Sequence, residues 1–430
     1  MNLHEEIKNV IPGGIDGNAK VFPGEMPIIS KAKGAYMYDT FGYEYIDYVS
    51  GYGPLLFGHS HPGFLNHLNE YMQQGILYGF PHKLMYDVGK KITEIIPCAE
   101  MIRFTNTGTE ATLNALRLAK GITQREKIVK FYGGYHGTHD FVLIGTKKQA
   151  SDVDFPFVSA DSAGITKGVQ KDTYTLQFND SEGFRRFMKE NGEDIAAVIV
   201  EPVLGSFGLI ADNSFMKTLR EETERFESLL IFDEIITGFR LGLGGAQEYY
   251  GIIPDITTLG KVLGGGIPIG AFVGRKVFME RIIPQKGHEI NSKEPVYHSG
   301  TFNSNPLSLA AAKWVLTKLI DDPNIMTTLN SKSDQLRRGF EKVMKSHGIK
   351  GITTGMHSIF QWYFGLETEP KTINDITNAN FSLLKDFHRE MVKSGVLFIG
   401  TPRGYVSSMH TDEDIKRTIN YADLALAKLL

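Results

Sequence analysis

An acid at the end of a strand pattern and a lysine among glycines have the types and spacing needed for cofactor chemistry. Asp233 follows four apolar residues, 229–232, that predict a short buried strand. Lys261 lies 28 residues further on, between Gly260 and the triple glycine 264–266, where a bulky group has room to approach the backbone. Pyridoxal phosphate forms a Schiff base with such a lysine, and an acid pairs with its pyridinium nitrogen. We expect Lys261 and Asp233 to have these two roles.

A turn between a strand pattern and a helix pattern could bind the phosphate of such a cofactor. Residues 101–105 predict a strand, and the sequence Asn-Thr-Gly-Thr-Glu at 106–110 leads into an amphipathic helix pattern. The free N–H groups and the dipole of a helix start attract anions, so we expect Gly108 and Thr109 to bind phosphate. The alternative for this turn is an ordinary capped turn without a ligand. For Asp233 the alternative is an acid at a common strand end, and for Lys261 it is a lysine on the surface.

A glycine-rich segment after the next strand pattern has two interpretations. It contains Tyr135, His136, His139 and Asp140. Tyr135 could lie flat on a planar ring with His136 beside it, or the two histidines and the acid could bind a metal ion. Because no second cluster of ligands follows downstream, we favour the ring platform and expect no metal.

Three further segments could contribute to the same site. Glu201 follows the strand pattern 195–200 and is a second acid at a strand end. Thr301 follows a glycine in a turn before a helix pattern and is a second candidate phosphate contact. Residues 146–175 are polar with little periodicity, and they predict a mobile loop over the site that contains Ser162.

The elements that would position these residues follow a recognisable order. Strand and helix patterns alternate from residue 100 to 275 and predict an α/β domain with a mostly parallel sheet. Short strand patterns between residues 28 and 49 predict a small antiparallel sheet. We therefore expect an N-terminal segment that packs with the C-terminal domain, a large domain and a smaller α+β domain, with the boundaries 1–60, 61–322 and 323–430.

The composition of the 430-residue chain limits its class. Hydrophobic residues make up 42%, the formal net charge is −3 and no basic stripe occurs, so nucleic acid is not an expected partner. Cys98 is the only cysteine, which excludes an intrachain disulfide and fits a reducing compartment. The acidic start is unlike a signal peptide, and no run of 18 apolar residues occurs. We expect a cytoplasmic enzyme without a membrane partner.

Several motifs of the chain resemble those of the fold-type I, class III pyridoxal-phosphate aminotransferases. They are Ile-Pro-Gly-Gly at 11–14, Arg-Phe-Thr-Asn-Thr-Gly-Thr-Glu-Ala-Thr at 103–112, Gly-Tyr-His-Gly at 134–137, Val-Glu-Pro-Val at 200–203, Phe-Asp-Glu-Ile-Ile-Thr-Gly-Phe-Arg at 232–240, Thr-Leu-Gly-Lys-Val-Leu-Gly-Gly-Gly at 258–266 and Gly-Thr-Phe-Asn-Ser-Asn-Pro at 300–306. The resemblance implies the fold-type I architecture and a homodimer with the site at its interface.

The resemblance also assigns roles to single residues. It implies that Lys261 forms the Schiff base, that Asp233 pairs with the pyridine nitrogen and that Tyr135 stacks on the ring. It implies that Thr301 reaches the phosphate of the neighbouring subunit. The other cofactor contacts expected on this basis are Gly108, Thr109, His136, Glu201 and Ser206.

Within the family the chain is most similar to the glutamate-1-semialdehyde 2,1-aminomutases, and its departures from their motifs are informative. Pro402 stands where they have a glutamate, and Lys20 stands where they have an arginine. Tyr52 replaces a tryptophan and Ser206 an asparagine. Arg403, followed by a glycine, instead resembles related β-amino-acid aminotransferases. Arginine binds a carboxylate through two hydrogen bonds, although a surface arginine is the alternative.

We therefore predict an aminotransferase that moves an amino group from an amino-acid or amine donor to a carbonyl acceptor by a ping-pong mechanism. The expected substrate contacts are Arg403, Lys20, Tyr52 and Ser162, which matches the family's loop serine. The alternative is the aminomutase reaction, which moves the amino group within glutamate 1-semialdehyde and gives 5-aminolevulinate. A racemase or decarboxylase on the same fold is a further alternative.

Overall fold

The computed structural model describes residues 3–22, 24, 26–146, 160–284, 296–400 and 403–430. The chain forms two compact units. Unit 1 consists of Met1–Pro62, Thr327–Glu369 and Asn378–Leu430, and unit 2 consists of Gly63–Met326 and Pro370–Thr377. The domain boundaries at residues 60 and 322 stay a prediction. No helix in the described ranges is long and apolar enough to cross a membrane.

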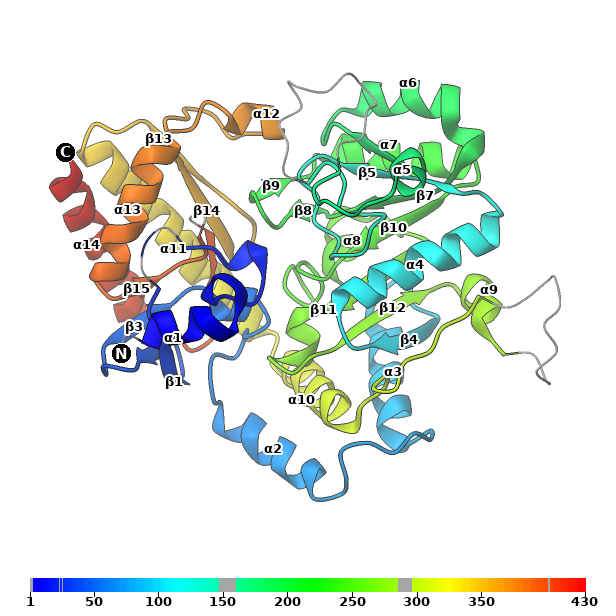
Figure 1. Ribbon diagram of the computed structural model, residues 1–430, viewed down its shortest axis with the longest axis horizontal. Helices are drawn as coiled ribbons and strands as arrows, with labels where there is room; N and C mark the ends of the chain where they lie inside the picture. The colour runs from blue at the N-terminus through cyan, green and yellow to red at the C-terminus, as the bar shows by residue number, and fades with distance from the viewer. Residues whose placement is uncertain (1–2, 23, 25, 147–159, 285–295, 401–402) are drawn as a thin grey trace. The chain divides into compact units, whose positions relative to one another are not determined.

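Unit 2 contains, among its described residues, a seven-stranded sheet (Figure 1). Its strands, in spatial order, are β4 (Met101–Thr105), β12 (Gly270–Gly274), β11 (Ile256–Gly260), β10 (Leu229–Asp233), β7 (Ile195–Val200), β5 (Lys127–Phe131) and β6 (Thr173–Leu176). Only β12 among them runs antiparallel to its neighbours, so the predicted α/β fold with a mostly parallel sheet is confirmed. The central strands are buried along their whole length, as strands covered on both faces must be.

Helices cover both faces of this sheet. Helix α4 (Gly108–Thr123) packs its apolar side chains against a core cluster that includes Ile128. Phe131 lies three residues further along β5, so its side chain points to the other face, where it contacts Phe215 of α7 (Asn213–Arg225). The other helices of unit 2 are α2 (Pro62–Met72), α3 (Lys83–Ile95), α5 (Lys167–Lys171), α6 (Ser181–Asn191), α8 (Gly245–Tyr250), α9 (Lys276–Met279), α10 (Pro306–Asp321) and α12 (Ile373–Ile376).

Unit 1 is built around two small sheets. The first has the order β1 (Ile29–Lys33), β2 (Tyr36–Asp39), β3 (Glu44–Asp47) and β15 (Val396–Leu397). Its first three strands are antiparallel, as predicted. The second contains β13 (Gly351–Thr354), β14 (Ile359–Phe364) and β16 (Arg403–Tyr405), all antiparallel. The helices of this unit are α1 (Leu3–Val10), most of α11 (Asn324–Ser346), α13 (Phe381–Lys393) and α14 (Asp412–Leu429).

Residues 146–175 were predicted as a mobile loop, but their described part contains a helix and most of a strand. Residues 147–159 lie outside the described residues, but 167–171 form α5 and 173–176 form β6. The strand at 173–176 was not predicted because three of its four residues, Thr-Tyr-Thr, have low hydropathy. Threonine and tyrosine nevertheless favour strands, and β6 gains its stability by pairing with β5 at the sheet edge. The loop prediction was therefore wrong for these residues.

Candidate functional site

Two acids leave the sheet of unit 2 side by side. Val200 at the end of β7 pairs with Phe232 in β10, so Glu201, which follows β7, and Asp233, the last residue of β10, lie at the same edge of neighbouring parallel strands. This is the carboxyl edge, where ligands bind in open α/β sheets. Both acids are buried, with exposed fractions of 4% and 3%. Lys261 follows β11, the neighbour of β10 on the other side, so parallel pairing brings the predicted lysine and acid to one edge.

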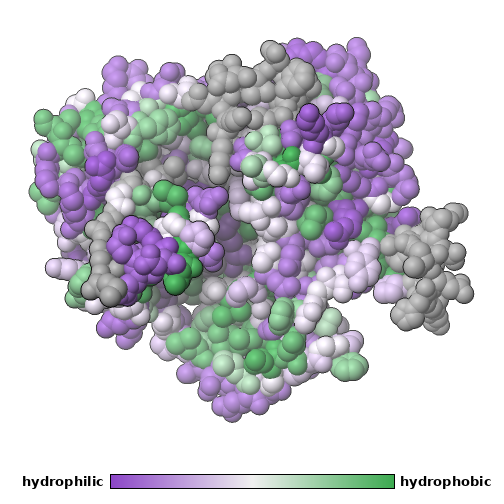
Figure 2. Space-filling model, in the orientation of Figure 1, coloured by the Kyte–Doolittle hydropathy of each residue, from purple (hydrophilic) through white to green (hydrophobic). Residues whose placement is uncertain are grey.

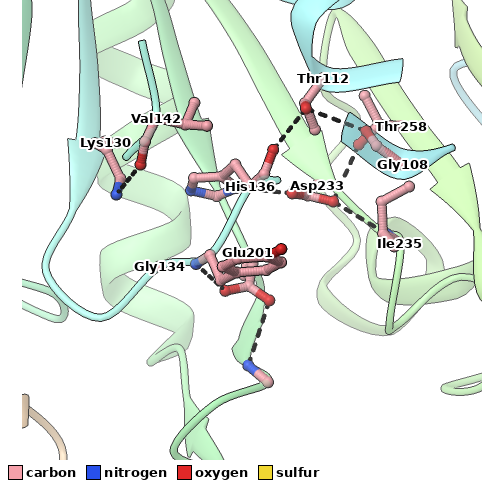
Figure 3. Close-up of polar contacts among 12 residues, drawn as sticks. Gly108, Thr112, Lys130, Gly134, His136, Val142, Glu201, Asp233, Ile235 and Thr258 are labelled. Carbon is pink, nitrogen blue, oxygen red and sulfur yellow. Dashed lines mark hydrogen bonds and ion pairs between the residues drawn. The ribbon is translucent and has the colours of Figure 1, made fainter. Parts of the chain in front are cut away.

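Three donors hold the Asp233 carboxylate in place (Figure 3). His136 lies with Nδ1 2.7 Å from Oδ2, and the hydroxyl of Thr258 and the backbone N–H of Ile235 each donate to Oδ1 at 3.1 Å. Burial lowers the pKa of His136, although Asp233 opposes this shift. The neutral imidazole must carry its proton on Nδ1, since a carboxylate can only accept. Asp233 is thus a fixed acceptor that is ready to receive a further donor.

The His136 segment is also tied to helix α4. The hydroxyl of Thr112 donates to the carbonyl oxygen of His136 at 2.6 Å (Figure 3). Because α4 begins at Gly108, this bond joins the predicted phosphate turn to the predicted ring platform. Sequence reasoning missed Thr112 and Thr258. The available signal was their position, one helical turn after Gly108 and three residues before Lys261.

Lys261 has an unusual backbone conformation. Its φ is 42°, in the left-handed region that residues other than glycine rarely adopt. The neighbouring Gly260 leaves little room for a side chain, because an added Cβ would lie 3.1 Å from Cδ1 of Ile235 and 3.3 Å from the carbonyl oxygen of Ile269. Strained residues of this kind cost on the order of 1–3 kcal/mol and concentrate at functional sites. The half-buried Lys261 is therefore placed at this edge by tight local packing.

The turn before α4 has the features of an anion site. Thr107 caps the helix by accepting from the N–H of Glu110 at 3.1 Å, and Gly108 and Thr109 are its first residues. The first N–H groups of a helix have no partner within the helix, and the helix dipole favours an anion there. Gly137 approaches this turn so closely that an added Cβ would lie 2.6 Å from Oγ1 of Thr109.

These groups together fit pyridoxal phosphate. An amine, a buried carboxylate with fixed geometry and a helix start of the kind that binds phosphate all belong to unit 2. The first two lie at the carboxyl edge of its sheet. Lys261 would hold the aldehyde carbon, Asp233 the ring nitrogen, and Gly108 with Thr109 the phosphate. Among the described residues, no group of three or more His, Cys, Asp or Glu is placed to bind a metal ion.

Glu201 is in a different state from Asp233. Its Oε2 accepts from the N–H of Tyr135 at 2.8 Å, and its Oε1 accepts from the N–H of Gly205 at 3.4 Å. Burial raises the pKa of Glu201 to about 8, and the charge of Asp233 adds to this rise. The Tyr135 N–H bond and the charge of Lys261 act in the opposite direction. The two acids at this edge therefore differ in their hydrogen-bond partners. Asp233 has a histidine partner, whereas Glu201 accepts from backbone N–H groups.

A buried lysine that the sequence analysis also missed lies on β5. All three donors of Lys130 are used, by the carbonyl oxygens of Val142 at 2.9 Å and Ile144 at 2.7 Å and by Oγ1 of Thr146 at 3.0 Å. Burial lowers its pKa to about 7, while Asp161 and Glu201 oppose the shift. Lys130 fixes the segment that follows the His136 loop.

The other predicted residues of unit 2 lie on turns. Tyr135 has an exposed fraction of 40%, which leaves its ring accessible, and Ser206 is half-buried in the turn after the short strand β8 (Val203–Leu204). Thr301 is exposed, and its turn contacts the phosphate turn through Asn106 Nδ2, which donates to Asn303 Oδ1 at 3.0 Å. Ser162 is exposed, and its hydroxyl donates to the carbonyl oxygen of Ala163 at 2.9 Å.

The remaining predicted substrate residues belong to unit 1 and are described within it. Lys20 and Tyr52 line one mostly apolar cavity of about 240 Å³. Arg403 is half-buried on β16, opposite Gln361 of β14. Burial raises the pKa of the Tyr52 hydroxyl, and the positive charge of Arg403 opposes this rise. Pro402 lies outside the described residues.

Comparison with known sequences gives matches over the whole chain. The family described as aminotransferase class-III matches residues 22–411. A glutamate-1-semialdehyde 2,1-aminomutase of Methanopyrus kandleri is 40% identical over 432 residues, which cover 100% of this chain and 97% of that protein.

Solved structures are similar over the same length. An omega-transaminase from Sphaerobacter thermophilus has a TM-score of 0.91 and 29% identity, with 99% of this chain and 96% of that chain covered. A β-phenylalanine aminotransferase from Variovorax paradoxus has a TM-score of 0.88 and 30% identity, with 99% and 93% covered.

Proposed function

The chain belongs to the class-III aminotransferase family, and from this premise we propose that Lys261 binds the cofactor of an amino-group transfer to a small carbonyl compound. The protein is an enzyme with the fold-type I architecture, and its cofactor is pyridoxal 5'-phosphate. One observation carries the assignment of residues. The fixed acceptor Asp233 ends one strand and the strained Lys261 follows its parallel neighbour, both at the ligand-binding edge of the sheet.

Each residue of this edge has a separate task in the proposed reaction. When bound, the cofactor supplies a ring that accepts electrons and stabilises negative charge on the substrate carbon. Asp233 keeps a proton on the ring nitrogen, and His136 holds the Asp233 carboxylate in the orientation required. The amine of Lys261 moves a proton between the substrate carbon that carries the amino group and the cofactor carbon that would be bound to Lys261. The N–H groups of Gly108 and Thr109 bind the phosphate.

The comparisons favour the aminomutase form of this reaction over the transaminase form that the sequence motifs predicted. The aminomutase of Methanopyrus kandleri is 40% identical over its almost complete length, whereas the transaminases of known structure are 29% and 30% identical. We therefore propose first that the substrate is glutamate 1-semialdehyde and that the amino group moves within it. A cytoplasmic location stays a prediction.

The purified protein is then expected to convert glutamate 1-semialdehyde to 5-aminolevulinate with no added donor or acceptor. Product formation is measured directly, with a Lys261→Ala variant as the inactive control. If no 5-aminolevulinate forms while separate amines do react, the aminomutase form is wrong.

A second candidate, transfer between two molecules, is favoured by the residues on the substrate side. Pro402 stands where the aminomutase motif has a glutamate, and Arg403 adds a positive charge at the next position. Ser206 stands where that motif has an asparagine. Like charges a few ångströms apart repel, so loss of the acid and gain of a guanidinium favours a substrate carboxylate at this place. Mixing the enzyme with single amines and following the absorbance of its cofactor would identify a donor.

For this candidate, Arg403→Ala is expected to raise KM for a carboxylated donor by roughly ten- to a hundred-fold. The reason is that a charge-assisted hydrogen bond contributes about 1.5–3 kcal/mol. The absorbance of the bound cofactor should not change. Lys20→Ala is the matched comparison, because Lys20 is the other predicted cation of unit 1. If only Lys20→Ala raises KM, the carboxylate is bound by the lysine and not by Arg403.

We also propose that the working form is a homodimer in which a second copy covers an apolar surface of unit 2. The surface is visible near α2 and α10 in Figure 2. The exposed apolar or aromatic side chains of the segment 65–86, which contains most of α2, include Leu65, Met72, Ile76, Leu77, Phe80 and Tyr86. Monomers rarely leave large apolar patches in contact with water, so exposed side chains of this kind favour a covering partner. In such a dimer Thr301 would reach the phosphate of the other subunit.

Sedimentation is therefore expected to give a dimer, and Phe80→Asp is expected to give a monomer with little activity. Phe80 has an exposed fraction of 79%, so the substitution does not disturb the core. Leu424→Asp is the matched control, because Leu424 is an exposed apolar residue on α14 of unit 1. A fully active monomer of the unaltered chain would contradict the proposal.

A further inference from the structure

The loop that carries Tyr135 and His136 follows a path that only glycine permits. Gly133 and Gly137 have φ values of 81° and 101°, in the left-handed region. An added Cβ at Gly133 would lie 2.6 Å from Cδ1 of Ile373, so the loop is also closely packed. Glycine restricts the backbone less than other residues, so residues 134–136 between these two glycines need other contacts to fix their positions.

Carboxylates at two strand ends provide these contacts. Asp233 binds the side chain of His136 (Figure 3). Glu201 accepts from the backbone N–H of Tyr135. The second oxygen of Glu201 accepts from the N–H of Gly205. Gly205 packs closely against Ile236, because a Cβ added to Gly205 would lie 2.0 Å from Cδ1 of Ile236. Glu201 therefore joins the Tyr135 loop to a turn that is itself immobilised by packing.

We propose that Glu201 is a positioning residue that sets the place of the Tyr135 ring for stacking on the cofactor. The inference rests on the proposed function and on the stacking of Tyr135 on that ring, which the motif resemblance predicts. Two N–H donors converge on the Glu201 carboxyl group, one on each oxygen. A side-chain amide could accept from only one of them, because its NH₂ group would face the other donor. Glutamine is therefore no substitute for Glu201 at this position.

A double-mutant cycle with pyridoxal phosphate as the probe tests this inference. The dissociation constant is measured for the unaltered protein, Glu201→Gln, Tyr135→Ala and the double variant. Glu201→Gln is expected to raise the constant about tenfold, because a buried donor loses its acceptor. In the Tyr135→Ala background, where no ring is left to position, the same change should raise it by less than about threefold.

Glu234→Gln is the matched control. Glu234 is also fully buried and also accepts backbone N–H groups, but its donors are Ala246 and Gln247 on the far side of the strand end. It should lower the melting temperature and leave the dissociation constant within about twofold. If Glu201→Gln and Glu234→Gln weaken binding equally, Glu201 has only a structural role.

The remaining outcomes also decide between the proposals. Equal effects of Glu201→Gln in both backgrounds would overturn the positioning role, while binding at Lys261 would still support the proposed function. If pyridoxal phosphate does not bind to Lys261 at all, the proposed function itself fails. Should Glu201→Gln not fold, Glu201→Asp replaces it in the cycle, because it keeps the carboxyl group and shortens its reach by one methylene. The same coupling with Tyr135 is then expected.

Discussion

Replacement of Lys261 by alanine is expected to lower kcat at least about 10³-fold, the largest effect of any single substitution in this chain. The variant loses the covalent attachment of the cofactor and the group that moves the proton, and positioned acid–base catalysis alone contributes about 10²–10⁴-fold. Single-turnover kinetics measure the loss. Because Lys261 is not part of the buried core, the melting temperature of the apoprotein should not fall.

Borohydride reduction identifies the lysine independently of activity. In the unaltered protein it should fix the cofactor to the peptide that contains Lys261, and in Lys261→Ala no peptide should be labelled. Label on the peptide of another lysine, such as the buried Lys130, would show that the attachment site has been assigned wrongly. The two lysines lie on different tryptic peptides, so mass spectrometry separates these results.

Asp233→Asn is expected to lower kcat/KM by roughly 10²–10⁴-fold. The amide is neutral, so it no longer keeps a proton on the ring nitrogen, and removal of one partner of a buried charged pair costs about 3–5 kcal/mol. The asparagine side chain at this position would also face both the His136 and the Thr258 donors with only one acceptor oxygen.

The adjacent acid is the control for this prediction. Glu234 is buried like Asp233, but its partners are Thr237, Ala246 and Gln247, away from His136. Glu234→Gln should therefore lower stability and leave kcat/KM nearly unchanged once the protein is folded. Comparable losses of kcat/KM in both variants would mean that Asp233 acts through the fold and not on the ring nitrogen.

The strands that carry the site were predictable because their sequences are short apolar runs. The predicted bounds of β4 and β7 agree with the structure, and the predicted run 229–232 covers β10 except for its last residue, Asp233. Once these strands are parallel, the carboxyl ends must meet at one edge, which is why Asp233 and Lys261 could be expected to lie together. Pattern and topology were sufficient to place Asp233, whereas β11, which precedes Lys261, was not among the predicted strands.

The contacts between strands and helices were not predictable in the same way. Thr258 and Thr112 look like ordinary β-branched residues, and only the packing of β11 and α4 directs their hydroxyl groups to Asp233 and His136. A glycine near the end of an apolar helix pattern, such as Gly121, predicts a helix end, yet α4 continues to Thr123. An added Cβ at Gly121 would lie 2.5 Å from Val296, so the glycine is required by close packing and not by a turn.

The left-handed backbone of Lys261 has a consequence for how such a chain would change under relaxed selection. Glycine and asparagine adopt this conformation at lower cost than lysine, so the most stable residue at position 261 is not the one that the reaction requires. A descendant that no longer needs the reaction would gain stability by exchanging the lysine for glycine. In diverged relatives, glycine or asparagine at this position would therefore mark the loss of catalysis before any other residue of the site had drifted.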